Sequence, residues 1–115
     1  GIPLERMTLS SDANGSLPKW NDKNEMIGIV AASMISLHNV LKELIQVEKM
    51  EVAEALRLAT TNVSQALELH ESKGKLQAGY DADILLLDRD FNLDTVIARG
   101  RLLMQRGELQ VQDTY

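Results

Sequence analysis

The hydrophobic pattern of this chain changes near residues 72–74, and this change limits the folds that the chain can adopt. Before it, apolar residues recur every three or four positions, as on one face of an α-helix. After Gly74, short apolar runs alternate with glycine, as in strands joined by tight turns. The sequence therefore predicts a helical region followed by an antiparallel β layer.

Three helices are predicted in the first region. The first covers residues 33–47 and buries one apolar face, formed by Met34, Leu37, Leu41, Leu44 and Ile45. The second covers residues 51–60. The third is short and is capped by Asn62. It ends before Gly74, a residue type that terminates helices.

Four short strands are predicted in the second region, at residues 84–87, 95–98, 102–104 and 109–111. Gly100 and Gly107 stand where hairpin turns are expected. These strands are too short and too few to close a barrel. The layer therefore needs further strands or a helical platform against its faces.

The start of the chain predicts a different arrangement. Residues 7–10 have the pattern of a short buried strand, residues 15–25 that of a loop, and residues 26–30 that of a further extended segment. A lone strand at residues 7–10 has no partner nearby in the sequence. Together with the missing initiating Met, this indicates the C-terminal part of a longer protein.

Composition excludes several classes of partner. Hydrophobic residues make up 44% of the chain and charged residues 25%, which is typical of a globular protein. The net charge of −5 and the scattered lysines and arginines argue against nucleic acid and anionic membranes, because both require a clustered positive face. Aromatic residues, at 3%, are too scarce for base stacking.

The absence of cysteine excludes a disulfide framework and a thiolate zinc site, and it fits a reducing compartment. No apolar run approaches the roughly 20 residues that span a bilayer, and the N-terminus has no basic-then-apolar signal pattern. We therefore expect a cytoplasmic location and no membrane partner.

Asp12 is the main candidate for chemistry. It follows the predicted strand and precedes a loop of small residues, the position at which α/β enzymes often hold catalytic groups. Asn14 and Gly15 both tolerate the positive φ of a tight turn. The alternative is that Asp12 is a turn residue whose carboxylate caps its own backbone.

The other titratable residues fit structural roles better. His38 lies at the edge of an apolar helix face, and His70 lies in a polar connector. The histidines show no HxH or HExxH spacing. Asp81, Asp83 and Asp88 fit turn and strand-end positions.

Three blocks resemble the C-terminal end of the amidohydrolase superfamily, over nearly the whole chain. They are Ser10-Ser11-Asp12-Ala13-Asn14-Gly15-Ser16, the stretch from Ala53-Glu54-Ala55-Leu56-Arg57 to Thr60-Thr61-Asn62-Val63, and Gly74-x-Leu76-x-x-Gly79-x-Asp81-Ala82-Asp83 with Ala98-x-Gly100. The last two are features of the superfamily in general. The first block, preceded by Gly1-Ile2-Pro3-Leu4-Glu5-Arg6, is similar to the isoaspartyl (β-aspartyl) dipeptidase family within it.

The resemblance implies an α/β fold that forms the C-terminal end of a metal-dependent (β/α)8 barrel, followed by short antiparallel strands of a small β-sandwich domain. Residues 1–72 would supply the last barrel strand and the C-terminal helices, and residues 73–115 would belong to the small domain. The resemblance also implies a homo-oligomer.

The same resemblance implies a binuclear zinc site and a dipeptide substrate. Asp12 would end strand eight, bind one metal ion and act as the general base toward the bridging hydroxide. Ser16 matches a position that contacts the bound dipeptide. Ala13 stands where a glycine is expected. The family's HxH pair, its bridging carboxylated lysine or glutamate and its two later histidines are missing from this sequence.

The function implied is hydrolysis of β-aspartyl dipeptides by metal-activated hydroxide in a longer protein, and the 115-residue chain alone is expected to be inactive. One alternative is another amidohydrolase, similar to dihydroorotase or to N-acyl-amino-acid deacylase. A different alternative is a non-catalytic assembly module, in which Asp12 is a turn residue and the β layer mediates oligomerisation.

Overall fold

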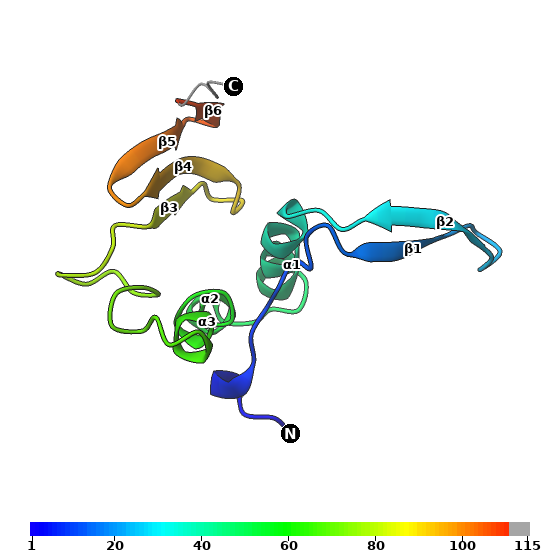
Figure 1. Cartoon of the computed structure of the whole chain (residues 1–115), viewed down its shortest axis with the longest axis horizontal. Helices are drawn as coiled ribbons and strands as arrows, with labels where there is room; N and C mark the ends of the chain where they lie inside the picture. The colour runs from blue at the N-terminus through cyan, green and yellow to red at the C-terminus, as the bar shows by residue number, and fades with distance from the viewer. Residues whose placement is uncertain (111–115) are drawn as a thin grey trace. The chain divides into compact units, whose positions relative to one another are not determined.

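The structure, a computed structural model, describes residues 1–110 and divides the chain into two compact units. The first unit, Gly1–Ala59, contains a 3-10 helix η1 (Leu4–Arg6), strands β1 (Ser16–Trp20) and β2 (Met26–Ala31), and helices α1 (Ile35–Gln46) and α2 (Val52–Arg57). The second unit begins at Thr60 and contains α3 (Thr61–Ala66), β3 (Ile84–Leu87), β4 (Leu93–Ala98), β5 (Arg101–Gln105) and β6 (Glu108–Leu109). The chain is thus a mixed α/β structure with antiparallel sheets, as predicted (Figure 1).

Strands β1 and β2 form an antiparallel hairpin in the first unit (Figure 1). Its register runs from Ser16↔Ala31 to Lys19↔Gly28, with a bulge next to Trp20. At the tip, Asn21 Oδ1 accepts hydrogen bonds from the N–H groups of residues 23 and 25, at 2.9 and 3.0 Å. The prediction of a loop over residues 15–25 was therefore wrong for residues 16–20, whereas the extended segment 26–30 is confirmed.

Residues 7–10 do not form the predicted strand. Met7 is extended, with φ −105° and ψ 139°, and the Leu9 N–H donates to the Leu58 carbonyl at 2.9 Å. A strand requires a ladder of such bonds to a neighbouring strand. Here the segment instead runs past the end of α2, so its backbone is extended without belonging to a sheet.

The helices are shorter than predicted but lie where the periodicity placed them. Leu37, Leu41, Leu44 and Ile45 of α1 are all half-buried. Met34 is 78% exposed because it precedes the first helical turn, as the N-cap. In α3, Thr60 is the N-cap, so the prediction that Asn62 caps this helix was wrong; Asn62 is a buried residue inside it.

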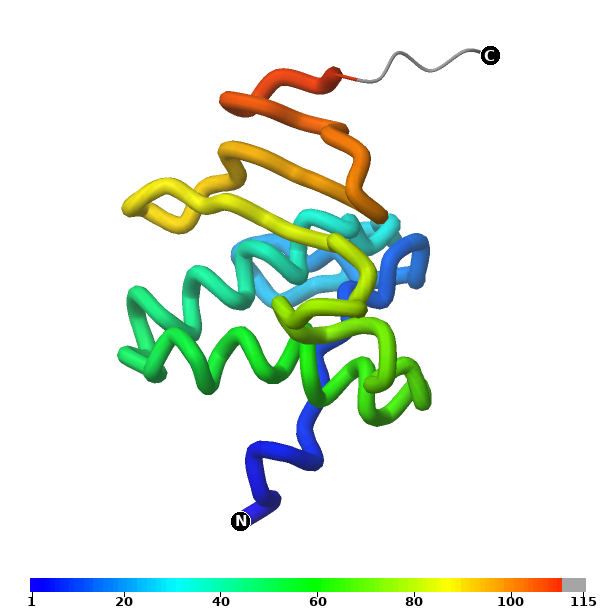
Figure 2. Tube along the Cα trace, turned by 90° about the vertical axis from the view of Figure 1, so that its left-hand side faces the viewer, coloured from blue at the N-terminus to red at the C-terminus, as the bar shows by residue number. Residues whose placement is uncertain are grey.

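The second sheet is a simple antiparallel meander with the order β3-β4-β5-β6 (Figure 2). This confirms the predicted antiparallel layer and the strand at 84–87, while β4 and β5 extend beyond the predicted 95–98 and 102–104. β6 covers Glu108–Leu109, so the predicted strand 109–111 was wrong for Gln110, which follows β6; Val111 lies outside the described residues.

Two Arg-Gly turns connect β4 to β5 and β5 to β6. Arg99 and Gly100 have φ values of 47° and 77°, and Arg106 and Gly107 have values of 51° and 77°. Left-handed conformation at both central residues is the hallmark of the type I′ hairpin turn. The two glycines thus have the role predicted from the sequence.

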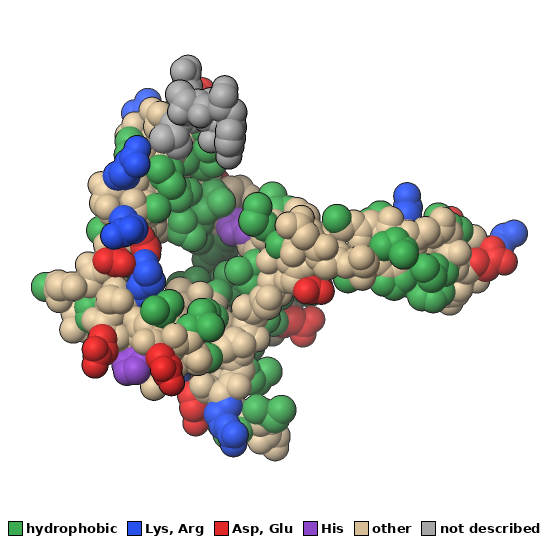
Figure 3. Space-filling view, viewed as in Figure 1, with side chains coloured by type: hydrophobic (Ala, Val, Ile, Leu, Met, Phe, Trp, Pro, Cys, Tyr) green, Lys and Arg blue, Asp and Glu red, His purple; other side chains and the backbone are tan. Residues whose placement is uncertain are grey.

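Few apolar side chains are buried in the described part of the chain. The buried hydrophobic residues of this part are Ala32, Ala55 and Leu58. Hydrophobic side chains are visible on the surface of the hairpin (Figure 3), where Trp20 is 56% and Ile29 65% exposed. Within residues 1–110, no helix has both the length and the apolar character needed to cross a membrane.

Candidate functional site

Asp12 begins a tight turn that leads directly into the hairpin. The Gly15 N–H donates to the Asp12 carbonyl at 2.8 Å, which closes a four-residue turn with Ala13 and Asn14 at its centre. Asn14 has φ 65°, and a positive φ at the third residue is typical of a type II turn. Asp12 itself has φ 47°, a conformation that Asp and Asn tolerate better than most residues. The predicted turn is confirmed, with its positive φ values at Asp12 and Asn14 rather than at Gly15.

Hydrogen bonds to Ala32, the residue after β2, and to α1 hold this turn in place. The Asn14 N–H donates to the Ala32 carbonyl at 3.0 Å, and the Ala32 N–H donates to the Gly15 carbonyl at 2.8 Å. The Ser36 hydroxyl, from the first turn of α1, donates to the carbonyl of Ser11 at 3.4 Å. The residue before Asp12 and the residues after it are therefore anchored to two different segments.

The Asp12 carboxylate is open to solvent. The residue is exposed, and within residues 1–110 no group donates a hydrogen bond to its carboxylate or forms an ion pair with it. Its own N–H donates to Ser10 Oγ at 3.3 Å. The turn-residue alternative requires the carboxylate to cap its own backbone. In the described part of the chain it does not do so. The carboxylate therefore has no partner among the described residues that an outside ligand would have to displace.

Ser16 lies on the other side of the same turn. It is the first residue of β1, is exposed, and pairs with Ala31 of β2. The turn thus brings the two predicted site residues together at the root of the hairpin. Their roles as metal ligand, base and substrate contact stay predictions.

The described residues fit one part of a metal site. A carboxylate oxygen is a donor that zinc accepts, and Asp12 offers it without a competing cation. No group of three or more His, Cys, Asp or Glu side chains among residues 1–110 could hold a metal ion together. His38 is half-buried on α1, and His70 is exposed. Within residues 1–110, Asp12 therefore offers a single carboxylate, and its binding of a metal ion stays a prediction.

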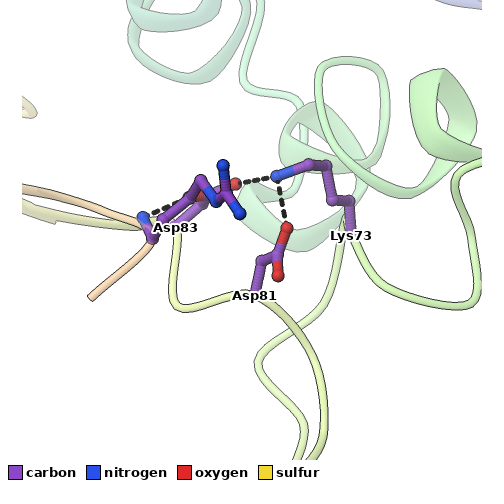
Figure 4. Close-up of polar contacts among 4 residues, drawn as sticks. Lys73, Asp81 and Asp83 are labelled. Carbon is purple, nitrogen blue, oxygen red and sulfur yellow. Dashed lines mark hydrogen bonds and ion pairs between the residues drawn. The ribbon is translucent and has the colours of Figure 1, made fainter. Parts of the chain in front are cut away.

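Lys73, Asp81 and Asp83 form an ion-pair cluster in the second unit (Figure 4). Lys73 Nζ lies 2.8 Å from Asp81 Oδ2 and 2.5 Å from Asp83 Oδ2. The other oxygen of Asp83 accepts the Arg99 N–H at 2.8 Å. The cluster therefore joins the segment after α3 to the β4–β5 turn, which confirms a structural role for both aspartates.

This cluster shifts the titration of its members. Hydrogen bonds to Asp81 and Asp83 raise the pKa of Lys73 above its ordinary value of 10.5. The hydrogen bond from Lys73, followed by the Arg99 N–H, lowers the pKa of Asp83 below its ordinary value of 3.8. Both charges are thus stabilised in the folded state, and neither is poised for proton transfer near neutral pH.

Asp88 also has the predicted structural role. Its Oδ1 accepts the N–H groups of Asp90 and Asn92, at 2.8 and 2.9 Å, and its Oδ2 accepts the Asn92 side-chain amide at 3.0 Å. These bonds order the β3–β4 connection. The Tyr80 hydroxyl donates to the backbone carbonyl of His70 at 2.7 Å. This contact uses the backbone of His70 and not its imidazole ring.

The sequence did not predict the roles of three residues that hold these turns and clusters together. Lys73 was not singled out, because its partners lie eight and ten residues away along a segment without helical or strand periodicity. Ser36 gives no sequence signal beyond a polar residue near a helix start. Gly15 was expected to adopt a positive φ, but its importance comes from a close approach to Asp12.

Comparison with known proteins places these features in a wider group. The profile of the amidohydrolase family matches residues 3–103. An N-acetylglucosamine-6-phosphate deacetylase of Lysinibacillus sphaericus is 30% identical over 68% of this chain and 20% of its own length. A 5-methylthioadenosine/S-adenosylhomocysteine deaminase of Moorella thermoacetica is 35% identical over 52% of this chain and 19% of its own length. The chain thus spans about a fifth of these curated relatives.

A solved structure covers more of the chain. It is a β-aspartyl dipeptidase of Fervidobacterium islandicum AW-1 in complex with a β-Asp-Leu dipeptide. Its chain matches 97% of this one with a TM-score of 0.79 and 30% sequence identity, and the match covers 30% of the dipeptidase chain. The matched part includes nearly all described elements.

Proposed function

Because this chain belongs to the amidohydrolase family, we propose that it forms the C-terminal part of a zinc-dependent hydrolase of β-aspartyl dipeptides. The observation that carries the proposal is the 97% coverage of this chain at 30% identity by an enzyme solved with β-Asp-Leu. Solved N-acetylglucosamine-6-phosphate deacetylases of Pasteurella multocida and Thermotoga maritima cover 85% and 89% of it, at 15% and 19% identity. The dipeptidase similarity is therefore the more complete one.

Within this proposal, residues 1–72 are the last strand and the C-terminal helices of a (β/α)8 barrel, and residues 73–115 belong to a small β domain. Active sites of such barrels lie at the C-terminal ends of the strands. An Asp12 that follows the extended residues 7–10 fits such a position. In the longer protein, residues 7–10 would gain the neighbouring strand that they lack here.

Asp12 has two roles in the proposed reaction. One carboxylate oxygen would bind metal, and the carboxylate would accept the proton of the attacking water. The oxygen of this water bonds to the amide carbonyl carbon, the carbon–nitrogen bond breaks, and Asp12 returns the proton to the leaving amine. Zinc, when bound, would supply Lewis-acid activation of that water. The open, unpaired carboxylate supports these roles.

Ser16 is proposed to contact the substrate. Its exposed position at the start of β1 places a hydroxyl beside the Asp12 turn, and a hydroxyl can donate to a carboxylate or accept from an ammonium group. A dipeptide carries both. Because Ser16 is held by its pairing with β2, its hydroxyl is offered on a fixed backbone.

The test is a substrate comparison with the full-length protein, loaded with zinc. We expect hydrolysis of β-Asp-Leu, little hydrolysis of α-Asp-Leu, loss of activity with a chelator and recovery with added zinc. Release of acetate from N-acetylglucosamine 6-phosphate, without cleavage of β-Asp-Leu, would assign the protein to the deacetylase activity instead. Inactivity toward every substrate in the presence of bound zinc would favour a non-catalytic module.

A further inference from the structure

We infer that Gly15 is a positioning residue for Asp12, because the space beside its α-carbon is occupied by the Asp12 carboxylate. A Cβ placed on Gly15 would lie 2.5 Å from Asp12 Oδ2, 2.7 Å from its Cγ and 2.8 Å from its carbonyl oxygen. Real Cβ atoms essentially never lie within 3.0 Å of such atoms. The inference rests on the proposed function of Asp12.

Conformational freedom does not explain this glycine. Gly74, Gly79, Gly100 and Gly107 have positive φ values, but Gly15 does not. A left-handed backbone therefore does not explain the glycine at residue 15. What residue 15 cannot accommodate is a side-chain atom, since the Asp12 carboxylate and carbonyl already fill that position.

A side chain at residue 15 would require Asp12 to move. Gly15 is held at both backbone groups, since its N–H donates to Asp12 and its carbonyl accepts from Ala32. Asn14 is tied to Ala32 as well. A methyl group at residue 15 would therefore displace the Asp12 carboxylate, distort the turn, or do both. Catalysis responds steeply to such shifts, and a misplacement of about 1 Å can cost about 10²-fold in rate.

The experiment compares two glycine variants of the full-length, zinc-loaded protein. We expect Gly15→Ala to lower kcat for β-Asp-Leu about 10²-fold, with a smaller change in KM, and to weaken zinc binding measured by equilibrium dialysis. The matched control is Gly28→Ala in β2. A Cβ there meets no atom within 4 Å and its φ is not positive, so kcat and zinc affinity should stay as in the wild type. An equal loss in both variants would overturn the inference.

A double variant separates positioning from a general structural effect. If Gly15 acts through Asp12, Gly15→Ala should cost little further activity in an Asp12→Asn background, so the two losses are not additive. Additive losses in the double variant would overturn the positioning role and leave the proposed function standing. The same conclusion would follow if Asp12→Asn were inactive while Gly15→Ala kept the wild-type kcat. Wild-type kcat in Asp12→Asn would instead overturn the proposed function.

If Gly15→Ala folds but is too unstable for kinetics, its melting temperature takes the place of kinetics as the readout. Asp12→Ala removes the contacts with Oδ2 and Cγ but keeps the contact with the carbonyl oxygen at 2.8 Å, so Gly15→Ala should lower the melting temperature less in that background than in the wild type. An unchanged loss in both backgrounds would show that the Asp12 carboxylate does not determine the cost of a side chain at residue 15.

Discussion

At the scale of single residues, Asp12 combines an uncommon backbone conformation with an open carboxylate. Its φ of 47° is one that Asp and Asn adopt more readily than other side chains, because their short polar groups reduce the steric cost. The exposed side chain contributes no hydrogen bond or ion pair within residues 1–110. The charge of Asp12 can therefore be removed without removing a stabilising contact of the described chain.

Asp12→Asn in the full-length protein should keep the fold and lose activity. Asparagine retains the shape and tolerates the same φ, but it cannot accept a proton and is a weaker metal ligand, so we expect kcat to fall by about 10³-fold or more. Circular dichroism should be unchanged, and steady-state kinetics with β-Asp-Leu measures the loss. Near-normal kcat would remove Asp12 from the mechanism.

Lys73→Met should return the titration of Asp83 toward normal. Lys73 is the first cause of the lowered pKa of Asp83, so its removal should raise that pKa toward 3.8, while the Arg99 N–H keeps it slightly low. The carboxyl carbon shift of Asp83, followed by NMR against pH, measures the change. Lys75→Met is the matched control, because no ion pair of Lys75 is present in the described chain. An equal shift in both variants would contradict the assignment.

The same cluster has a defined pH range. Because the pKa of Asp83 is lowered, its charge stabilises the fold above pH 3.8, and this stabilisation is lost as the pH falls through the pKa of the folded state. Because the pKa of Lys73 is raised, its charge stabilises the fold below pH 10.5, and this stabilisation is lost as the pH rises through the pKa of the folded state. Lys73→Met should therefore have its full destabilising effect between these limits. Because the groups are exposed, the effect should also decrease with added salt.

At the scale of elements, the β4–β5 turn tests how much the Arg-Gly sequence matters. Gly100 has φ 77° and open space around its α-carbon, so an alanine there would meet backbone strain rather than a steric clash. We expect Gly100→Ala to lower the free energy of unfolding by about 1 kcal/mol and Gly100→Asn to lower it less. Urea denaturation measures both. Equal stability of the wild type and both variants would show that the turn does not require a residue that readily adopts the left-handed conformation at position 100.

The β1–β2 hairpin shows why sequence patterns can miss a strand. Residues 16–20 contain Pro18, which removes a backbone donor, and Lys19, and they precede a polar tip, so the segment has the composition of a loop. β2 is recognisable from its β-branched residues. Once β2 is formed, the tight turn at Asp12 and the Asn21 bonds at the tip bring residues 16–20 beside it. β1 is thus defined by its partner.

At the scale of the whole molecule, the described chain exposes much apolar surface. Leu85, Leu86 and Leu109 of the second sheet are 57%, 51% and 73% exposed, and no large side chain in the described residues is fully buried. Exposed strands with apolar side chains favour association with other strands. We therefore expect the 115-residue chain by itself to self-associate as its concentration rises.

Light scattering over a wide concentration range measures this association. Leu86→Lys should weaken it if the second sheet is the contact, and Ile29→Lys if the hairpin is the contact. A monodisperse monomer at every concentration, with a sharp unfolding transition, would show that these surfaces are satisfied without a partner. The same measurement on the full-length protein tests the proposed homo-oligomer.

Local pattern was sufficient for part of this protein. The periodicity of residues 33–47 determined α1, the apolar runs after Gly74 determined β3, β4 and β5, and the glycines at 100 and 107 determined their turns. The motif around Asp12 predicted the candidate site, and the tight turn that it predicted is confirmed. All of these depend on interactions between residues close in the sequence, which a single sequence displays directly.

Tertiary structure decided the features that depend on distant partners. The strand character of residues 16–20, the absence of a strand at residues 7–10 and the Lys73 cluster were all set by which groups meet in space. A backbone group or a charge has many possible partners along the chain, and its hydrogen bond forms with whichever partner the fold brings within about 3 Å. For that reason the sequence located the Asp12 carboxylate, while the folded hairpin determined how it is held.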